Sequence, residues 1–398
     1  MSFLKKILLC LCITNSAWAF TSDVVATVPV MAQALGNSTV TTNAVPMAPS
    51  FTVQGYILID ANSGYVIAEK NADAHLPPAS LTKIMTLYLA AEALQSGRVH
   101  FEDMVPISGN AWRKGGSRMF IKVGSVVPVK DLINGIVIAS GNDATVAMAE
   151  YLGGSEDAFA NLMNKTAAAL GMKDTHYVDS NGLPEPTHYS SPRDIATLAR
   201  AWILTFPQYY PWFKQQWFEY NGIKQPNRNR LLWHDPSVDG MKTGHTDDAG
   251  YCLVASAQRN GMRLIAVVMG AINDKARTDD TEGLLNYGFR FFETQKLYSS
   301  NTVLVAPRVW FGKKNTVPLG VKNDLYVTVP VGRFKDVKIS VSLSDLKAPI
   351  VKGQVCGVVN VTLDDKIIAI QPLIALNDNL RGGIFSVGWD KMAKVFSH

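Results

Sequence analysis

The chain has 398 residues and a mass of 43.4 kDa, enough for two or three domains with cores of their own. Its hydrophobic share of 47% and charged share of 18% exclude a largely disordered protein. The formal net charge of +5 is mild, and no basic run is interleaved with aromatic residues, so nucleic acid is not an expected partner.

The first 19 residues have the pattern of a secretory signal peptide. Two lysines precede an apolar run, and a small-x-small cleavage site ends at Ala19. A membrane-spanning helix is the alternative, but it needs about 20 apolar residues. Because Thr14 and Asn15 interrupt the run, residues 1–19 are predicted to be removed. The mature protein is then expected to work outside the cytoplasmic membrane.

The next segments predict a leader and then a mixed α/β domain. Residues 20–49 are rich in Thr, Ala, Val and Pro and carry almost no charge, which is typical of a flexible leader. From residue 50, two apolar runs flank a turn at Asn62-Ser63-Gly64 and predict a β-hairpin. Strands are predicted again over 239–271, with a turn at Asn260-Gly261. The helices predicted between and after these strands are Ser80 to about Gly97, two runs that meet at 140–142, Ser155 to Gly171, 190–209 and 280–297. Strands at both ends with helices between them predict a sheet flanked by helices over residues 50–297.

After residue 297 the composition changes to short Val/Ile-rich runs with turns between them. This pattern predicts a small all-β domain over residues 298–378. Cys252 and Cys356, the two cysteines beyond the signal peptide, lie in strand-like stretches of the two different domains. They are therefore expected to be buried thiols and not a disulfide.

The last segment, residues 379–398, predicts an amphipathic helix. Four large apolar side chains share one helical face: Phe385, Trp389, Met392 and Phe396. A tryptophan on such a face, with lysines on the others, favours a helix lying in a membrane surface. A helix that packs back on its own β domain is the alternative, and the sequence leaves it open.

The segment Ser80-Leu-Thr-Lys83 carries the candidate nucleophile. A serine reacts only where a nearby group takes its proton and donors stabilise the resulting oxyanion. Ser80 and Lys83 are three apart on a predicted helix and share one face. Ser80 is at the helix N-terminus, where free N–H groups favour negative charge, and burial would lower the pKa of Lys83. A second Ser-x-x-Lys match at 344–347 has no helical period and is interpreted as a solvated loop.

Two further triplets have a context that indicates a site. Ser-x-Asn occurs at 108–110, 140–142 and 299–301, but only 140–142 interrupts two apolar helices, where a polar triplet is pushed into a cleft. The 108–110 copy precedes a polar, Gly-rich surface run. Lys242-Thr243-Gly244 opens an apolar strand. In this order the triplets are the signature of penicillin-binding proteins and class A β-lactamases.

With these residues in place, the chain resembles the secreted low-molecular-mass penicillin-binding proteins that are D-alanyl-D-alanine carboxypeptidases. The segments that carry the resemblance, in the family's order, are SLTKIMT, GSRMF, ASGNDA, GSEDAF, MKTGHTDDAGY and YGFRFFET. The layout is also similar: signal peptide, catalytic domain, small β domain and amphipathic tail. The resemblance implies a β-lactamase/DD-peptidase-like catalytic fold.

The resemblance also implies a catalytic set. Ser80 would attack the carbonyl carbon of the penultimate D-Ala, with Lys83 as general base, to give an acyl-enzyme. Ser140 would relay a proton to the leaving D-Ala amine. Water would then hydrolyse the ester, whereas β-lactams would remain as stable adducts. No metal or other cofactor is implied.

The substrate-binding residues implied by the resemblance come mainly from the Lys-Thr-Gly strand. Lys242, Thr243 and Gly244 would bind the substrate, and the N–H groups of Ser80 and His245 would form the oxyanion hole. Asn142 would hold the substrate backbone. Arg277 would grip the terminal carboxylate, although an ordinary surface arginine is the alternative there.

The partners implied are peptidoglycan stem peptides that end in D-Ala-D-Ala, β-lactam antibiotics, and a membrane surface contacted through the tail. The expected location is the periplasm, with peripheral attachment to the inner membrane. A nucleic-acid partner is not expected.

The sequence also bears on four other functions. A class A β-lactamase needs a glutamate in an ExxLN motif between the Ser-x-Asn and Lys-Thr-Gly elements, but here EGLLN, at 282–286, follows Lys242. A metallopeptidase is disfavoured because the seven histidines are far apart, without HExxH spacing. A non-catalytic envelope protein is disfavoured because the reactive residues are all present. An endopeptidase that cleaves crosslinks ending in D-Ala stays open.

Overall fold

The computed structural model describes residues 26–27, 45–383 and 387–390. The predicted signal peptide, 1–19, and most of the predicted leader lie outside the described residues. The chain divides into two compact units, and each is described by itself. Among the described residues, one comprises 45–295 with Tyr326–Phe334, and the other comprises 26–27, Lys296–Leu325, 335–383 and 387–390.

The first unit is built on a five-stranded antiparallel sheet. Its strands, in spatial order, are β3 (Val66–Lys70), β2 (Gly55–Asp60), β10 (Met262–Ala271), β9 (Gly250–Arg259) and β8 (Val238–Thr246). Both predicted hairpins are confirmed. In the second of them, Asn260 and Gly261 have φ values of +50° and +82°, as a tight two-residue turn between twisted strands requires.

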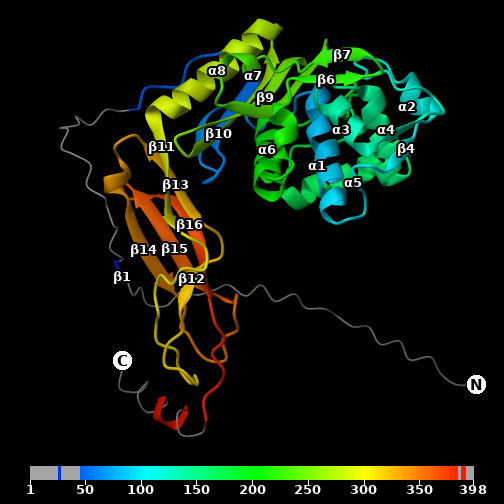
Figure 1. Cartoon of the computed structure of the whole chain (residues 1–398). Coiled ribbons are helices and arrows are strands. Elements are labelled where there is room, and N and C mark those ends of the chain that lie inside the picture. The colour runs from blue at the N-terminus through cyan, green and yellow to red at the C-terminus, as the bar shows by residue number, and fades with distance from the viewer. Residues whose placement is uncertain (1–25, 28–44, 384–386, 391–398) are drawn as a thin grey trace, which may run out of the picture. The chain divides into compact units, whose positions relative to one another are not determined.

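Helices cover both faces of this sheet (Figure 1). The elements are η1 (Ala79–Thr82), α1 (Lys83–Gln95), α2 (Gly109–Arg113), α3 (Val129–Val137), α4 (Asn142–Gly153), α5 (Glu156–Leu170), α6 (Pro192–Thr205), η2 (Tyr210–Lys214), α7 (Leu231–His234) and α8 (Asp274–Phe291). Helix α8 packs on β9 and β10, whereas α6 packs on β2 and β10. These layers enclose two hydrophobic clusters, and the larger one surrounds α1. Nearly every residue of α1 is buried, as its all-round apolar sequence predicts.

Two short two-stranded sheets complete the unit. The strands β4 (Met104–Pro106) and β5 (Val126–Pro128) form one of them, and β6 (Trp217–Tyr220) and β7 (Ile223–Pro226) form the other.

Local sequence signals explain where the helices beside the site begin and end. Helix α5 begins after Ser155, whose side chain accepts a hydrogen bond from the Ala158 N–H, and ends before Gly171, which has φ of +80°. Both ends agree with the prediction. The helix predicted from Ser80 begins instead as the 3₁₀ turn η1, and the α-helix proper starts at Lys83. Pro77 and Pro78 stand directly before this turn and restrict the backbone there.

The second unit is all-β, as its sequence predicts. Its sheet has the order β1 (Ala26–Thr27), β14 (Lys338–Leu343), β15 (Val355–Leu363), β16 (Lys366–Ala375) and β12 (Leu319–Val321). β13 (Leu325–Pro330) belongs almost entirely to the first unit, where it pairs with β11 (Phe292–Tyr298), and the 3₁₀ turn η3 (Phe334–Asp336) lies where the chain passes back to the second unit. Cys356 in β15 and Cys252 in β9 are both free and buried, which confirms the expectation of two thiols.

Residues at the end of the predicted leader are packed. Val45 and Ala48 lie against the smaller hydrophobic cluster, and the Tyr287 hydroxyl donates to the Pro46 carbonyl over 2.8 Å. Ordered packing therefore begins at least five residues before residue 50, because these apolar side chains find a partner in α8.

Part of the predicted tail helix is described, over residues 387–390. Trp389 is 70% exposed, whereas the Asp390 carboxylate is buried and accepts hydrogen bonds from Arg308 (2.9 Å) and from the Phe311 N–H (2.6 Å). Phe385, Met392 and Phe396 lie outside the described residues. In the described part of the chain, no helix is both long and apolar enough to cross a membrane.

Candidate active site

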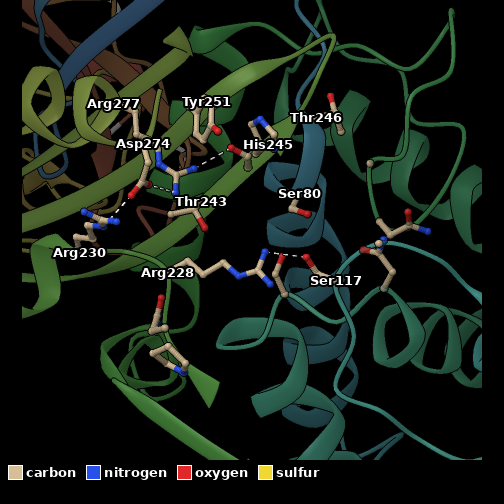
Figure 2. A pocket seen from close by; sticks show the side chains of 18 of the residues that line it. Ser80, Ser117, Arg228, Arg230, Thr243, His245, Thr246, Tyr251, Asp274 and Arg277 are labelled. Atoms are coloured by element: carbon tan, nitrogen blue, oxygen red, sulfur yellow. Dashed lines mark hydrogen bonds and ion pairs between the residues drawn. The ribbon is translucent and has the colours of Figure 1, made fainter. Parts of the chain in front are cut away.

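A pocket of about 990 Å³ lies between the sheet edge at β8 and the helical part of the first unit. Figure 2 shows Ser80, at the start of the helical turn, facing the strand that carries Thr243 and His245. Seven of the nine predicted site residues line it: Ser80, Ser140, Asn142, Thr243, Gly244, His245 and Arg277. The other two, Lys83 and Lys242, are buried and hydrogen-bonded to residues that line it. The structure therefore brings all nine together.

Ser80 and Lys83 are in direct contact. The Nζ atom of Lys83 lies 2.7 Å from Oγ of Ser80, and Lys83 itself is fully buried. Burial lowers the pKa of Lys83 to about 7, opposed by the negative charges of Asp179 and Asp143 and assisted by Arg228. At neutral pH a large share of the amine is therefore unprotonated and able to accept the serine proton.

Two further oxygens surround the Lys83 amine. Nζ donates to Asn142 Oδ1 over 2.7 Å and to the backbone carbonyl of Asn181 over 2.8 Å. A neutral amine has two N–H donors and one lone pair. Because both oxygens are pure acceptors, they take the two hydrogens, and the lone pair is left to face the Ser80 hydroxyl. This arrangement is that of a general base aimed at a nucleophile.

The Ser140–Asn142 triplet enters the pocket because it separates α3 from α4. Ser140 has φ of +56°, an uncommon conformation for a residue with a side chain, and the Asn142 N–H donates to the Ser117 carbonyl over 2.7 Å. The 108–110 copy is elsewhere and has a different task. Ser108 caps α2 by accepting a hydrogen bond from the Ala111 N–H. The 299–301 copy also lies outside the pocket.

The Lys-Thr-Gly segment is part of β8. Lys242 donates to Ser140 Oγ over 2.9 Å, and its pKa lies well below the usual value, first because it is buried and then because Lys83, Arg228 and Arg277 repel its charge. Gly244 allows β8 to approach the nucleophile closely. A Cβ there would lie 3.0 Å from the Pro78 carbonyl oxygen and 3.3 Å from the Ser80 nitrogen.

This close approach places the Ser80 and His245 backbones on facing sides of the pocket. Ala79, directly before the nucleophile, has φ of +46°, a strained conformation of the kind that functional turns hold. Two N–H groups on facing chain segments form the usual arrangement for an oxyanion hole. The His245 ring lies against Tyr251, with ring centroids 4.0 Å apart and an interplanar angle of 39°.

Arg277 lies deeper than a surface arginine. It is buried, its Nη1 donates to the Gly244 carbonyl over 3.0 Å, and its Nη2 pairs with Asp274 over 2.5 Å. Asp274 also pairs with Arg230, as Figure 2 shows. Much of the Arg277 guanidinium is therefore occupied in holding the end of β8, and the surface alternative considered from sequence is wrong.

Arg228 is a pocket residue that the sequence reasoning did not find. Its Nη1 donates to Ser117 Oγ over 2.7 Å, and in Figure 2 its guanidinium points into the pocket toward Ser117. It belongs to the loop between β7 and α7, where no periodicity marks a residue as pointing inward. The Asn181 carbonyl was missed as well, because a backbone acceptor leaves no trace in side-chain identities.

Asp143 is a third residue that the sequence did not single out. Its carboxylate is fully buried and accepts hydrogen bonds from the N–H groups of Met119, Phe120 and Ile121 over 2.9 to 3.2 Å. It thereby ties residues 119–121, the end of the GSRMF sequence and the residue after it, to the start of α4. Its position next to Asn142, a predicted site residue, was the sequence feature that could have identified it.

The EGLLN sequence does not contribute to the site. It lies on α8, where Leu284 and Leu285 are fully buried in the smaller hydrophobic cluster. Glu282 does not line the pocket. The rejection of this motif as a β-lactamase glutamate therefore agrees with its place in the fold.

Comparisons with known proteins agree over nearly the whole chain. The family model for D-alanyl-D-alanine carboxypeptidase matches residues 41–273, and the model for the penicillin-binding protein 5 C-terminal domain matches residues 292–379. D-alanyl-D-alanine carboxypeptidase DacA of Escherichia coli (strain K12) is 46% identical over 363 residues, which cover 89% of this chain and 90% of that protein. DacC of the same strain is 46% identical over 358 residues, 88% of this chain and 90% of the relative.

Solved structures give the same result. Penicillin-binding protein 5 from Haemophilus influenzae superposes with a TM-score of 0.81 at 43% identity, covering 84% of this chain and 100% of that one. Penicillin-binding protein D2 from Listeria monocytogenes, in its ampicillin-bound form, superposes with a TM-score of 0.56 at 30% identity, covering 60% of this chain and 98% of that one. The chain therefore belongs to the family of serine D-alanyl-D-alanine carboxypeptidases, penicillin-binding enzymes of peptidoglycan metabolism, and carries the C-terminal domain of penicillin-binding protein 5.

Proposed function

We propose that this carboxypeptidase removes the terminal D-Ala with Ser80 as nucleophile and Lys83 as general base. One observation carries the assignment: the buried Lys83 amine has two pure acceptors on its N–H groups and the Ser80 hydroxyl at 2.7 Å. No rearrangement is needed for the amine to take the hydroxyl proton.

Acylation then follows from the positions of the remaining groups. Ser80 Oγ attacks the penultimate D-Ala carbonyl carbon while its proton passes to Lys83, and the oxyanion lies between the Ser80 and His245 N–H groups. The C–N bond breaks as the leaving nitrogen receives a proton through Ser140, whose hydroxyl is held by Lys242. Water hydrolyses the Ser80 ester and releases the shortened stem peptide.

The substrate carboxylate is best matched by Arg228 together with Thr243. Arg228 presents its guanidinium to the pocket, whereas Arg277 already bonds Gly244 and Asp274. We therefore place Arg277 behind the carboxylate, where its charge adds to the field and its bonds hold β8. Asn142 holds the substrate backbone opposite this strand.

Benzylpenicillin tests the nucleophile directly, because its acyl adduct persists long enough for intact-mass measurement. The parent protein is expected to gain one penicillin mass, and Ser80→Ala is expected to gain none. Ser344→Ala is the matched control, because Ser344 begins the other Ser-x-x-Lys sequence, outside the pocket. An adduct on Ser80→Ala would remove Ser80 from the proposed role.

The proposed division of the chain also predicts where the protein is located in the cell. We propose a signal peptide at 1–19, a leader at 20–49 whose residues from 45 onward pack on the catalytic domain, the catalytic domain at 50–297, the β domain at 298–378 and the tail at 379–398. This enzyme of the cell envelope would then be periplasmic and attached peripherally to the inner membrane. The exposed Trp389 supports a tail face that is available to lipid.

A second activity has one observation in its favour. The pocket takes in Trp217 and Trp233, which are 50% and 40% exposed with ring centroids 6.1 Å apart, so it offers more apolar surface than a D-Ala-D-Ala terminus needs. This surface favours cleavage of D-Ala crosslinks as a side activity. Trp217→Ala should then slow cleavage of a crosslinked dimer more than release of D-Ala from a pentapeptide. Equal slowing of the two reactions would argue against it.

A further inference from the structure

The third partner of Lys83 comes from a loop with no catalytic motif, residues 178–182. The N–H of Gly182 donates to Asp179 Oδ1 over 2.6 Å, and the carbonyl of Asn181 accepts from Lys83 Nζ over 2.8 Å. These two groups belong to one peptide unit. In a trans peptide the N–H and C=O point in opposite directions, so Asp179 and Lys83 grip the two ends of a single rigid plane.

Asp179 fixes this peptide with a second bond. The same Oδ1 atom accepts from the Asn181 N–H over 2.9 Å, and Asp179 is only 9% exposed. Gly182 has φ of +84°, and a Cβ on it would lie 1.8 Å from the Ala79 carbonyl oxygen. The turn therefore packs directly against the segment that carries Ser80, and its backbone has little freedom to rotate.

His188 links the 178–182 loop to the 3₁₀ turn η1, which carries Ser80. Its Nδ1 accepts from the Val178 N–H over 3.2 Å, so its Nε2 carries the proton and donates to Thr82 Oγ1 over 2.9 Å. Burial lowers the pKa of His188 and keeps the ring neutral. Thr82 lies between Ser80 and Lys83 in sequence, so His188 connects the loop to the turn that carries the nucleophile.

We propose that Asp179 is a positioning residue for the general base, holding the Asn181–Gly182 peptide so that its carbonyl turns the Lys83 lone pair toward Ser80. This inference rests on the proposed role of Lys83. It assigns a catalytic purpose to a loop outside the three signature triplets. His188 supports the same peptide indirectly, through Val178 and Thr82.

Because Asp179 is charged, its proposed role can be tested through the pH dependence of activity, which a purely structural residue would not change. Asp179 raises the pKa of Lys83 against the larger effect of burial. The other titratable or charged groups in this cluster are Asp143 on α4, Glu156 on α5 with its partner Lys114, Arg228 on the loop before α7, Lys242 on β8, and His188, whose Nδ1 lies 3.8 Å from Asp179 Oδ1. Asp179→Asn keeps an oxygen acceptor for both N–H groups and removes only the charge.

The experiment measures kcat/KM for D-Ala release and the rate of acylation by a fluorescent penicillin, each against pH. For Asp179→Asn, the acidic limb should move about one unit to lower pH, because the Lys83 pKa falls. For Asp179→Ala, which frees the peptide, the plateau should fall about 100-fold, the cost of misplacing a catalytic group. Both variants should remain folded, as judged by melting temperature.

Asp235 provides the matched control. It is also 9% exposed, and its Oδ1 also accepts from the backbone of its own turn, at Ser237 over 2.8 Å. Asp235→Asn and Asp235→Ala should lower the melting temperature and leave the pH profile and plateau unchanged. Superimposable profiles for parent and Asp179→Asn, or equal plateaus for Asp179→Ala and Asp235→Ala, would overturn the inference.

Lys83→Arg separates this inference from the proposed function. Release of D-Ala by Lys83→Arg at the parental rate would show that Lys83 is not the base, and the proposed function itself would fail. An inactive Lys83→Arg together with an unmoved Asp179→Asn profile would overturn only the positioning role.

Discussion

The Nζ atom of Lys242 lies 2.9 Å from Oγ of Ser140, although 102 residues separate them in the chain. Both residues are buried, so their hydrogen bond lies in a weakly screened environment. The strand proposed to bind the substrate is thereby joined to the hydroxyl proposed to protonate the leaving group.

This contact predicts strong coupling between the two residues. Ser140→Ala and Lys242→Met should each lower kcat/KM for D-Ala release by about 100-fold, the usual scale for a proton-transfer group. Because both changes interrupt the same proton path, the double variant should be scarcely worse than either single one. A double-mutant cycle measures this coupling, and fully additive losses would show that the residues act independently.

The pH dependence of the parent enzyme should follow Lys83. Its pKa is lowered to about 7 by burial, and only the unprotonated amine accepts the serine proton. Activity is therefore expected to rise with pH as the buffer passes through about 7 and to level off above it. Initial acylation rates with a fluorescent penicillin, taken between pH 5 and 9, check this. An acidic limb centred near the ordinary carboxylate pKa would point to another base.

Arg228 should act mainly on substrate binding. Arg228→Gln removes the charge proposed to meet the terminal carboxylate, so KM should rise about tenfold while kcat changes less. A substrate that ends in D-alaninamide has no carboxylate, and parent and variant should treat it alike. Arg193→Gln is the control, because Arg193 pairs with Glu69 and Asp73 outside the pocket. An unchanged KM for Arg228→Gln would assign the carboxylate to another residue.

Much of this site was predictable because its side chains stand at element ends with strong local signals. Ser140–Asn142 interrupts two apolar runs, and this predicted that it would reach a cleft. Lys242–Gly244 was expected to open an apolar strand, but it forms the fifth to seventh residues of β8 and reaches the pocket from within that strand. Their convergence on Ser80 followed from a known order of triplets. The helix from Ser155 to Gly171 was predictable in the same way, from its cap residues.

The parts that were not predictable depend on backbone geometry or on loops. The Asn181 carbonyl is presented by a turn whose direction is set by Asp179, and no sequence period reports it. Arg228 lies in a loop, and the sequence of a loop does not show whether a side chain points to solvent or into a pocket. The 3₁₀ start at Ala79–Thr82 reflects packing against β8, which lies more than 150 residues further along the chain.

The tail proposal predicts a change in fractionation. A chain that ends at Asp378 lacks the amphipathic segment and should move from the membrane fraction to the soluble fraction, with D-Ala release unchanged. Trp389→Ala in the full chain should weaken membrane attachment, because it removes one large apolar side chain from the lipid-facing side. Continued sedimentation of the shortened chain with membranes would support the alternative, in which the tail packs on its own β domain.

Release of D-Ala from a peptide ending in D-Ala-D-Ala, by the mature protein and by Ser80→Ala, tests the central claim most directly. The account predicts steady release by the mature protein and a loss of nearly all release in the variant, with the melting temperature of the fold preserved. Equal release by both proteins would contradict the assignment of Ser80 as the nucleophile.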